Sequence, residues 1–407
     1  MKTFEQLGLD QKLMTAINRL GFTEPTTIQE RSIPLIFDGK DIIGESATGS
    51  GKTLAFGCGV LKTVVPRRGL QSLILTPTRE LAEQVKDALR ELAHGKQLNI
   101  IAVYGGVSIN TQIHALRNAE IVIGTPGRLL DHLQRRTINM SKISILVIDE
   151  ADRMFDMGFQ RDVEKIIRTC PRDRQTLFFS ATIPASIMAF AKRHMDQPDQ
   201  VFAEKMVDQE KLEQTYLDVT RDMKFYKLTE LLQNENSGLA MVFCNTRRTT
   251  DYVVRHLKAE KIRAIGIHGG LSQKMRSLNL DKFNNYRVNV LVCTDVASRG
   301  LHIDNVSKIY NYDMPRDPND YIHRIGRTAR AGESGKVINL VSNSDYTHFS
   351  KILRTYRTFE MENLDIPGMT KSGSQKPKRP GSYNKRKFAY RSNRSIRPKR
   401  NHYQNKR

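Results

Sequence analysis

The feature that most restricts how this chain can fold is a series of short, continuous apolar runs separated by longer helical patterns. In the first half the runs are "DIIGES", "SLILTPT", "IVIGTP", "ILVIDEAD" and "TLFFSAT", with helical segments such as "TRELAEQVKDALRELA" between them. Strands without polar alternation indicate a parallel sheet covered by helices on both faces. A second series, "AMVFCNT", "IRAIGIH", "VNVLVCT", "KIYNY" and "KVINLV", follows a polar stretch. The sequence therefore predicts the α/β class, with two parallel-sheet domains of similar size.

Length and composition agree with this prediction. The 407 residues exceed one ordinary core, and 39% apolar with 27% charged residues is typical of a soluble globular protein. No stretch approaches the roughly 20 apolar residues of a membrane helix, and the first residues lack the pattern of a signal peptide. The cysteines, Cys58, Cys170, Cys244 and Cys293, are widely separated, which argues against a zinc site or a disulfide framework. We therefore expect a cytoplasmic protein in a reducing compartment.

The positive charge is concentrated at the C-terminal end. Residues 370–407 hold 14 Lys or Arg and no Asp or Glu, so they carry +14 of the net charge of +22 and leave +8 for the remainder. Pro, Gly, Ser and Asn recur there with little apolar material, which predicts a disordered tail. Aromatic residues among the cations could stack on exposed bases while Lys and Arg contact phosphates. A solvated, solubilising tail is the alternative.

The loop after the first predicted strand has the composition of a phosphate-binding loop. It reads "SATGSGKT" and begins at Ser46. In parallel sheets, ligands bind outside the carboxyl ends of the strands, where this loop is expected. Gly49 and Gly51 allow a tight backbone around a phosphate. Lys52 suits the β- and γ-phosphates, and the Thr53 hydroxyl suits Mg²⁺. A chance flexible loop is the alternative, since Ser46 stands where the general pattern has glycine.

Three carboxylates lie where another predicted strand ends. In "VIDEADRMFDMGF" the apolar run is followed by Asp149, Glu150 and Asp152. Unpaired carboxylates near a low-dielectric interior cost several kcal/mol each, so we expect a cation to compensate them. Beside a bound Mg-triphosphate, Asp149 would bind the cation directly or through water. Glu150 would orient or deprotonate the water that attacks the γ-phosphate. An acidic strand end facing solvent is the alternative.

The motifs together resemble those of the DEAD-box RNA helicase family, from Phe4 through about Asp345. The letters at 149–152 spell the family name, and "GFTEPTTIQ" resembles its adenine-reading Q motif. The resemblance implies that Gln29 hydrogen-bonds the adenine edge and that Phe4 packs on the base. It implies further nucleotide contacts by Phe22, Ser46, Ala47, Thr48, Gly49, Ser50, Gly51, Lys52 and Thr53, with Thr53 and Asp149 as metal ligands.

The same resemblance assigns RNA contacts and catalytic arginines through "PTRELA", "TPGR", "SAT", "VFCNT", "QKMR", "CTDVASRGLHI" and "HRIGRTAR". Arg327 and Arg330 would be arginine fingers that meet the γ-phosphate when the domains close, a role that suits permanently charged planar donors. Without the family, such arginines more often form surface salt bridges. The implied RNA contacts are Pro77, Thr78, Arg79, Gly105, Gly106, Thr125, Pro126, Gly127, Arg128, Gln273, Arg276 and Thr294. The implied coupling residues are Asp152, Ser180, Thr182 and His323.

Four positions depart from the usual family text. Ser46 replaces alanine, Ala329 replaces glycine and Gly270 replaces aspartate. His302 replaces an aspartate that is expected to meet the ATP ribose. A neutral histidine donates one hydrogen bond but is not a charged acceptor, so we expect a weakened ribose contact.

The resemblance also implies the organisation of the chain and its activity. We expect a Q-motif region at 1–30, an ATP-binding RecA-like domain at 31–203, a linker at 204–211, a C-terminal RecA-like domain at 212–367 and a disordered basic RNA-binding tail at 368–407. The implied function is an ATP-hydrolysing RNA helicase that unwinds short duplexes locally and non-processively, and remodels RNA or ribonucleoprotein. ATP and Mg²⁺ are the expected cofactors, RNA is the expected partner, and a monomer is expected.

Two other functions stay open at the level of the sequence. One is an ATP-gated RNA clamp or annealing chaperone, driven mainly by the basic tail. The other is a DNA translocase of the same superfamily, which would require processive motion and stimulation by DNA.

Overall fold

The computed structural model describes residues 2–47, 49–203, 212–234, 238–298, 303, 306–328, 335–356 and 361–363. The predicted linker at 204–211 and the predicted tail at 368–407 lie outside the described residues. So do Thr48, His302, Ala329 and Arg330.

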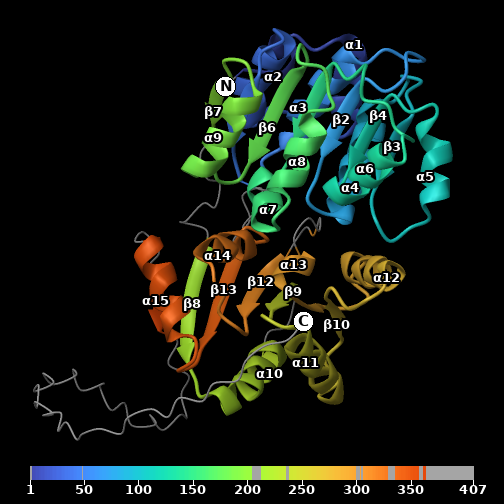
Figure 1. Cartoon of the computed structure of the whole chain (residues 1–407). Coiled ribbons are helices and arrows are strands. Elements are labelled where there is room, and N and C mark those ends of the chain that lie inside the picture. Colours follow the sequence, from blue (N-terminus) through green and yellow to red (C-terminus); the bar gives the residue numbers. More distant parts are fainter. Residues whose placement is uncertain are drawn as a thin grey trace, which may run out of the picture. The chain divides into compact units, whose positions relative to one another are not determined.

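The first domain is a seven-stranded, fully parallel sheet with the order β3-β4-β2-β5-β6-β1-β7 (Figure 1). Its strands are β1 (Ile42–Glu45), β2 (Ser72–Leu75), β3 (Ile100–Val103), β4 (Ile121–Gly124), β5 (Ile145–Ile148), β6 (Gln175–Ser180) and β7 (Asp199–Phe202). Its helices are η1 (Phe4–Leu7), α1 (Gln11–Arg19), α2 (Thr27–Phe37), α3 (Lys52–Thr63), α4 (Arg79–Leu92), α5 (Ile109–Leu116), α6 (Pro126–Gln134), α7 (Ala151–Asp156), α8 (Gln160–Ile167) and α9 (Ala185–His194).

Helices cover both faces of this sheet, as the continuous apolar strands predict. Ile145 and Val147 of β5 belong to one buried cluster, and Leu146 and Ile148 belong to another, because successive side chains of a strand point to opposite faces. Helices α1 to α4 contribute to the first cluster, and α5 to α9 contribute to the second. Each helix presents an apolar stripe to the sheet. Helix α4, for example, buries Ala82, Val85, Leu89 and Leu92 at three- and four-residue spacing.

The second domain repeats the same architecture with the order β10-β11-β9-β12-β13-β8-β14. Its strands are β8 (Leu212–Asp218), β9 (Leu239–Phe243), β10 (Ala264–Ile267), β11 (Val290–Cys293), β12 (Val306–Asn311), β13 (Gly335–Val341) and β14 (Glu362–Asn363). Its helices are η3 (Arg221–Met223), α10 (Lys224–Asn234), α11 (Arg247–Ala259), α12 (Gln273–Asn284), α13 (Asp295–Ser298), α14 (Pro318–Ile325) and α15 (Tyr346–Thr355).

The two sheets have one topology. When the strands of each domain are numbered from its own first strand, both orders read three, four, two, five, six, one, seven. All the described pairings are parallel, so the carboxyl ends of the strands share one edge in each domain. The predicted motif loops therefore gather at one edge of each sheet.

Two further expectations concern the cysteines and the membrane. All four cysteines are free and buried in the structure. Burial raises the pKa of the Cys170 thiol to about 11, which keeps it protonated. Within the described ranges, no helix has both the length and the hydrophobicity that crossing a bilayer requires.

Candidate nucleotide and RNA site

The phosphate loop connects β1 to α3 and is closed by its own hydrogen bonds. Gly49 and Gly51 have φ angles of 84° and 90°, a region that favours glycine. A Cβ atom at Gly51 would lie 2.1 Å from Nε2 of Gln29, so the loop and the Q-motif helix need this glycine. Lys52 is 6% exposed, and its Nζ donates to the carbonyl oxygens of Ser46 and Ala47 at 2.7 and 3.0 Å. Burial lowers the pKa of Lys52, against the opposing charge of Asp149.

The Q-motif helix α2 is tied directly to that loop. Thr26 Oγ1 donates to the carbonyl oxygen of Ser50 at 2.7 Å, and Gln29 Nε2 donates to that of Gly51 at 3.1 Å. Gln29 Oε1 also accepts from the backbone N–H of Thr26 in a capping box. Gln29 retains a second N–H and a second oxygen lone pair, which are the groups that an adenine edge would use.

The two aromatic residues predicted near the base occupy different environments. Phe22 is 44% exposed and lines the cavity beside the phosphate loop. Phe4 is 2% exposed and packs in the hydrophobic core of the first domain, and it is absent from the residues that line the cavity. Phe22 is therefore the aromatic side chain placed to meet a base, and the contact expected of Phe4 stays a prediction.

Asp149 directly follows β5, and its carboxylate is incompletely partnered. Its backbone N–H donates to the carbonyl oxygen of Leu75 at 3.0 Å, and its side chain is 3% exposed. Within the described part of the chain, Oδ1 of Asp149 has no hydrogen-bond partner. Burial, followed by the charge of Glu150, raises the pKa of Asp149 to about 7. A buried orphan carboxylate oxygen beside Lys52 and Thr53 fits a hard cation such as Mg²⁺.

Glu150 has an unusual backbone and a buried partner. Its φ angle is 53°, a left-handed conformation that is uncommon outside glycine and that turns the chain from β5 into α7. Its Oε2 accepts from Nη1 of Arg153 at 2.6 Å, and Arg153 is 1% exposed. Among the described residues, Nε and Nη2 of Arg153 have no partner. Arg153 was missed at the sequence level, because an arginine one turn along a helix normally indicates a surface charge.

The elements expected to couple nucleotide and RNA sites are joined by hydrogen bonds. Asp152 Oδ2 accepts from the backbone N–H and the hydroxyl of Thr182, at 2.9 and 3.1 Å. The backbone N–H of Asp152 donates to Ser180 Oγ at 3.1 Å. The "DEAD" and "SAT" segments thus form one unit, although 28 residues separate Asp152 from Ser180 in the chain.

A cavity of about 360 Å³ brings most of the predicted nucleotide residues together. Its volume is in the range of small-molecule sites. It is lined by Phe22, Gln29, Gly49, Gly51, Lys52, Thr53, Asp149, Glu150 and Arg327, among others. Ser46, Ala47 and Ser50 adjoin it through the loop hydrogen bonds, and Ser50 Oγ donates to Ser46 Oγ at 2.8 Å.

The residues predicted to contact RNA in the first domain also converge. Gly106 has a φ angle of 86°, and a Cβ atom there would lie 2.0 Å from Nη1 of Arg79. A Cβ atom at Gly105 would lie 3.4 Å from Arg79 Nη2 and 4.0 Å from Arg128 Nη2. Pro77 and Thr78 precede α4, and Thr125, Pro126 and Gly127 begin α6, so two helix N-termini and two guanidinium groups share this surface. Such groups suit backbone phosphates.

In the second domain, the predicted RNA residues contact one acidic side chain. Gln273 Nε2 donates to Oε1 of Glu80 at 3.0 Å, and Arg276 Nη2 pairs with the same oxygen at 3.0 Å. Thr294 follows β11 and caps α13 by accepting backbone N–H groups at its carbonyl oxygen. His323 is 8% exposed within α14.

Comparisons with known proteins agree with this arrangement. A model of the DEAD/DEAH box helicase family matches residues 26–190, and a model of the helicase conserved C-terminal domain matches residues 223–332. The ATP-dependent RNA helicase CshA of Listeria monocytogenes is 43% identical over 370 residues, which span 90% of this chain and 71% of that protein. The DEAD-box ATP-dependent RNA helicase CshA of Bacillus subtilis is 42% identical over 368 residues, or 90% of this chain and 74% of that protein. The chain belongs to the DEAD-box RNA helicase family.

A solved structure extends the likeness to the fold. Dbp5 of S. cerevisiae, bound to RNA and ADP BeF3, has a TM-score of 0.83 at 33% identity, over 89% of this chain and 96% of that chain. The predicted RecA-like architecture and the enzyme class, an ATP-dependent RNA helicase, are confirmed. The roles of individual residues in this DEAD-box helicase stay predictions.

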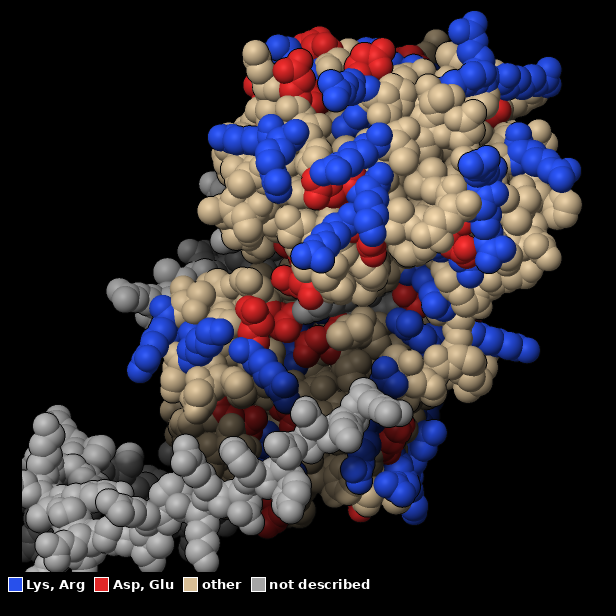
Figure 2. Space-filling model, viewed as in Figure 1, with Lys and Arg blue, Asp and Glu red and all other residues tan. Residues whose placement is uncertain are grey.

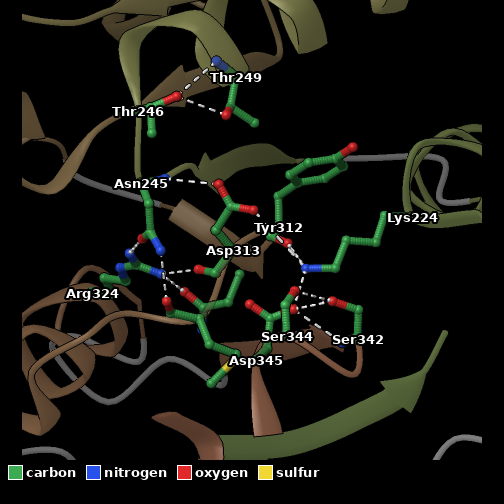
Figure 3. A network of polar contacts seen from close by, with 12 residues as sticks. Lys224, Asn245, Thr246, Thr249, Tyr312, Asp313, Arg324, Ser342, Ser344 and Asp345 are labelled. Carbon is green, nitrogen blue, oxygen red and sulfur yellow. Dashed lines mark hydrogen bonds and ion pairs between the residues drawn. The ribbon is translucent and has the colours of Figure 1, made fainter. Parts of the chain in front are cut away.

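A buried polar network in the second domain of the DEAD-box helicase holds the helix that precedes Arg327 (Figure 3). Arg324 of α14 is 1% exposed. It forms a two-point ion pair with Asp295, through Nε at 2.6 Å and Nη2 at 2.7 Å. Its Nη1 donates to Asn311 Oδ1 at 2.9 Å and to the carbonyl oxygen of Asp313 at 2.6 Å. All three guanidinium nitrogens therefore have partners, and α14 is fixed to the strand ends.

The network continues to α10 and α15. Lys224 Nζ donates to Asp345 Oδ2 at 2.7 Å and to the carbonyl oxygen of Tyr312 at 2.6 Å (Figure 3). Burial alone would raise the pKa of Asp345, but hydrogen bonds from Lys224 and Ser342 outweigh it and hold that pKa below its usual value. Asp313, next to Tyr312, is partly exposed, and its burial is the main cause that raises its pKa. Neither Arg324 nor Lys224 was identified from the sequence, because their partners are far away in the chain.

Proposed function

We propose that this DEAD-box helicase couples RNA-stimulated ATP hydrolysis to local, non-processive separation of short RNA duplexes. The observation that supports the proposal most is that Lys52, the adjacent Asp149 and Glu150, and Arg327 line one cavity, although they come from three distant segments of the chain. The cavity thus combines a phosphate anchor, a cation ligand, a base and a positive charge for the transition state.

Each side chain has a role that follows from its chemistry. Lys52 binds the β- and γ-phosphates in place of the two loop carbonyls to which it donates in this structure. Thr53 and Asp149 would hold Mg²⁺, which neutralises charge on the phosphates when bound. Glu150 orients or deprotonates the attacking water. Arg327, with Arg330 outside the described residues, stabilises negative charge that develops on the γ-phosphoryl group.

RNA binding would be coupled to this site through closure of the two domains. Arg79, Arg128 and the helix N-termini near Gly105 contact phosphates of a single strand, and Gln273, Arg276 and Thr294 do the same in the second domain. Each ligand favours the closed form, because each gains contacts there that the open form lacks. Asp152, Ser180, Thr182 and His323 transmit the nucleotide state. Closure would bend the bound RNA strand. Because an A-form duplex cannot adopt this bend, the complementary strand would be released.

One variant distinguishes the helicase function from its main alternative, an ATP-gated clamp or annealing chaperone. Glu150→Gln keeps the size of the side chain but removes the base, so we expect hydrolysis to fall at least about 100-fold and unwinding to stop. An ATP-gated clamp or annealing chaperone would keep strand annealing at the parental rate and show no dependence of its output on hydrolysis. Glu164→Gln on α8, whose carboxylate pairs with Arg168 at the surface, is the matched control. Parental unwinding by Glu150→Gln would contradict the proposal.

The basic tail is proposed to add sequence-independent RNA affinity. Its +14 charge supports this role, since each phosphate contact releases counterions. Truncation after Met369 is expected to weaken RNA binding and to flatten its dependence on salt, while nucleotide affinity stays unchanged. Equal RNA affinity and an equal salt slope in the truncated chain would refute this role. Ribonucleoprotein substrates, a monomeric state and a cytoplasmic location belong to the same proposal, and four free cysteines support the last.

A further inference from the structure

A cluster of aromatic rings lies between α10 and α11 of the second domain, outside the motifs described above. Tyr252 and His256, one turn apart on α11, have ring centroids 4.1 Å apart at an interplanar angle of 38°. Phe225 of α10 packs edge-on against both, at 5.9 Å from Tyr252 and 5.5 Å from His256. The His256 ring is further fixed by a 2.8 Å contact from Nδ1 to the carbonyl oxygen of Tyr252. The Tyr252 ring is thus held in place by its neighbours.

Part of this cluster faces solvent. Tyr252 is 39% exposed, and Tyr226, next to Phe225 on α10, is 59% exposed. Apolar side chains that are exposed singly need no explanation, but exposed rings on two neighbouring helices form a patch, and such patches often mark interaction sites. A rigid, partly exposed ring binds a flat partner with little loss of conformational entropy.

The charge of α11 adds to the aromatic surface. The helix contains four Lys or Arg and one acid, Asp251, whose Oδ1 lies 2.9 Å from Nε2 of His268. Arg248 and Arg255 lie four residues before and three residues after Tyr252, so the three share one face of the helix. Both arginines are exposed, and within the described residues neither has an ion-pair partner. Figure 2 shows Lys and Arg gathered over the region that Figure 1 labels α11.

The position of this surface relates it to the RNA path. Helix α11 begins after Thr246, at the end of the "VFCNT" motif and at the carboxyl edge of the sheet. Arg255 lies nine residues further along, which is about 13 Å on a helix. The surface therefore starts at the edge that carries the motifs and continues away from it, past the reach of the motif residues.

We propose that Tyr226, Arg248, Tyr252 and Arg255, the α10–α11 face, bind single-stranded RNA that extends beyond the motif site. Exposed tyrosine rings stack on bases without regard to sequence, and arginines contact the intervening phosphates. A protein partner would also use Tyr and Arg. The excess of positive charge and the RNA substrate of the family favour RNA. The face would let the helicase hold a single-stranded overhang next to the duplex it opens.

The test uses the full chain with the double variant Arg248→Glu/Arg255→Glu. Lys351→Glu/Arg354→Glu on α15 is the matched control, because it makes the same change in net charge at two exposed cations three residues apart. Affinity is measured for an oligouridine of about 8 nucleotides, near the size of one single-strand site, and for one of about 30 nucleotides. We expect the α10–α11 variant to bind the long RNA about tenfold more weakly than the control does, with equal affinity for the short RNA.

A second measurement reports the location directly. Long RNA that carries 4-thiouridine should crosslink to peptides of α10 and α11 in the parent protein, and Tyr226→Ala should reduce the yield on α10. Hydrolysis stimulated by the short RNA should stay parental in all these variants, which separates this proposal from the proposed catalytic mechanism. Equal affinity of the two double variants for long RNA, or crosslinks that avoid both helices, would assign the face to a different partner and overturn the proposal.

Discussion

The two domains share one strand order but differ in how the charged groups beside their proposed catalytic residues are partnered. In the first domain, Asp149 has a buried oxygen without a partner, and Arg153 has two such nitrogens among the described residues. In the second domain, the buried Arg324 has a partner for each guanidinium nitrogen, from Asp295, Asn311, Asn245 and the backbone. Since an unpaired buried charge costs several kcal/mol, this difference needs an explanation.

The difference follows from what each domain must bind. In the proposed site of the first domain, a nucleotide with its cation would supply the partner that Asp149 Oδ1 lacks and would replace the two loop carbonyls to which Lys52 donates. The second domain supplies Arg327 at the end of a helix whose position must already be correct when the nucleotide arrives. A preorganised charge costs no reorganisation at the moment of reaction. In the first domain, the proposed site is completed only when its ligand binds. In the second domain, the buried contacts that hold helix α14 are already complete without a ligand.

The largest expected effect comes from breaking the complete network. Arg324→Leu leaves Asp295 and Asn311 without their partner, so we expect a loss of about 3–5 kcal/mol in the free energy of unfolding. Urea denaturation followed by circular dichroism measures this loss, and Arg354→Leu at the exposed face of α15 is the control. A free energy of unfolding equal to that of the control would show that the network does not support the second domain.

The next largest effect is expected at the proposed nucleotide site of the first domain. There, a substitution should reduce activity and leave stability intact. Lys52→Ala removes the proposed phosphate anchor, so we expect ATP hydrolysis to fall by about 10²–10³. Stability should not fall with it. Burial lowers the pKa of Lys52, which means that at neutral pH its charge opposes folding, and the alanine variant should be at least as stable as the parent. Lys62→Ala, at the exposed end of the same helix, is the control for both measurements.

The lysine prediction has two independent ways to fail. A parental hydrolysis rate in Lys52→Ala would remove Lys52 from the nucleotide site. A clear drop in melting temperature would instead show that Lys52 stabilises the loop through its two carbonyl contacts.

The sequence predicted the parts of the fold whose residues are continuous in the chain. Five strands in each half were identified from apolar runs, and the structure confirms them as parallel strands. The remaining strands were not identified. β3 is a short apolar run at an edge of the first sheet, with its two middle residues partly exposed, and β8 mixes apolar and polar residues beside the edge strand β14 of the second sheet. Strands at or near an edge need less apolar surface, so an apolar run identifies them less readily.

In the candidate site, too, the sequence predicted only the features that are local in the chain. The phosphate loop and Asp149 are local motifs, and the structure places them around one cavity as expected. Phe4 is buried in the core, and a residue 17 positions before the Q motif carries no local sign of that burial, so its expected contact with the base stays a prediction. Arg153 and Arg324 were not identified at all. A buried arginine is recognised by its partners, and those partners become neighbours only in the fold.

A substitution of Arg153 is expected to have the smallest effect, and it tests whether the incompletely partnered charges of the first domain serve catalysis. Its single ion pair fixes the carboxylate of Glu150, which is already held in a left-handed backbone conformation. We expect Arg153→Leu to slow hydrolysis about tenfold at saturating ATP while ATP affinity stays unchanged, because orientation of the base affects the chemical step alone. Its loss of stability should be smaller than that of Arg324→Leu, since two of its nitrogens have no partner to lose.

The conservative variant separates positioning from packing. Arg153→Lys keeps one donor toward Glu150 and should recover part of the hydrolysis rate, whereas a packing role would be served equally well by leucine. If the leucine variant hydrolysed ATP at the parental rate, the buried ion pair would be a structural feature of α7 alone. In that case the contrast between the domains would rest on Asp149 alone, whose unpartnered oxygen lies in the proposed cation site.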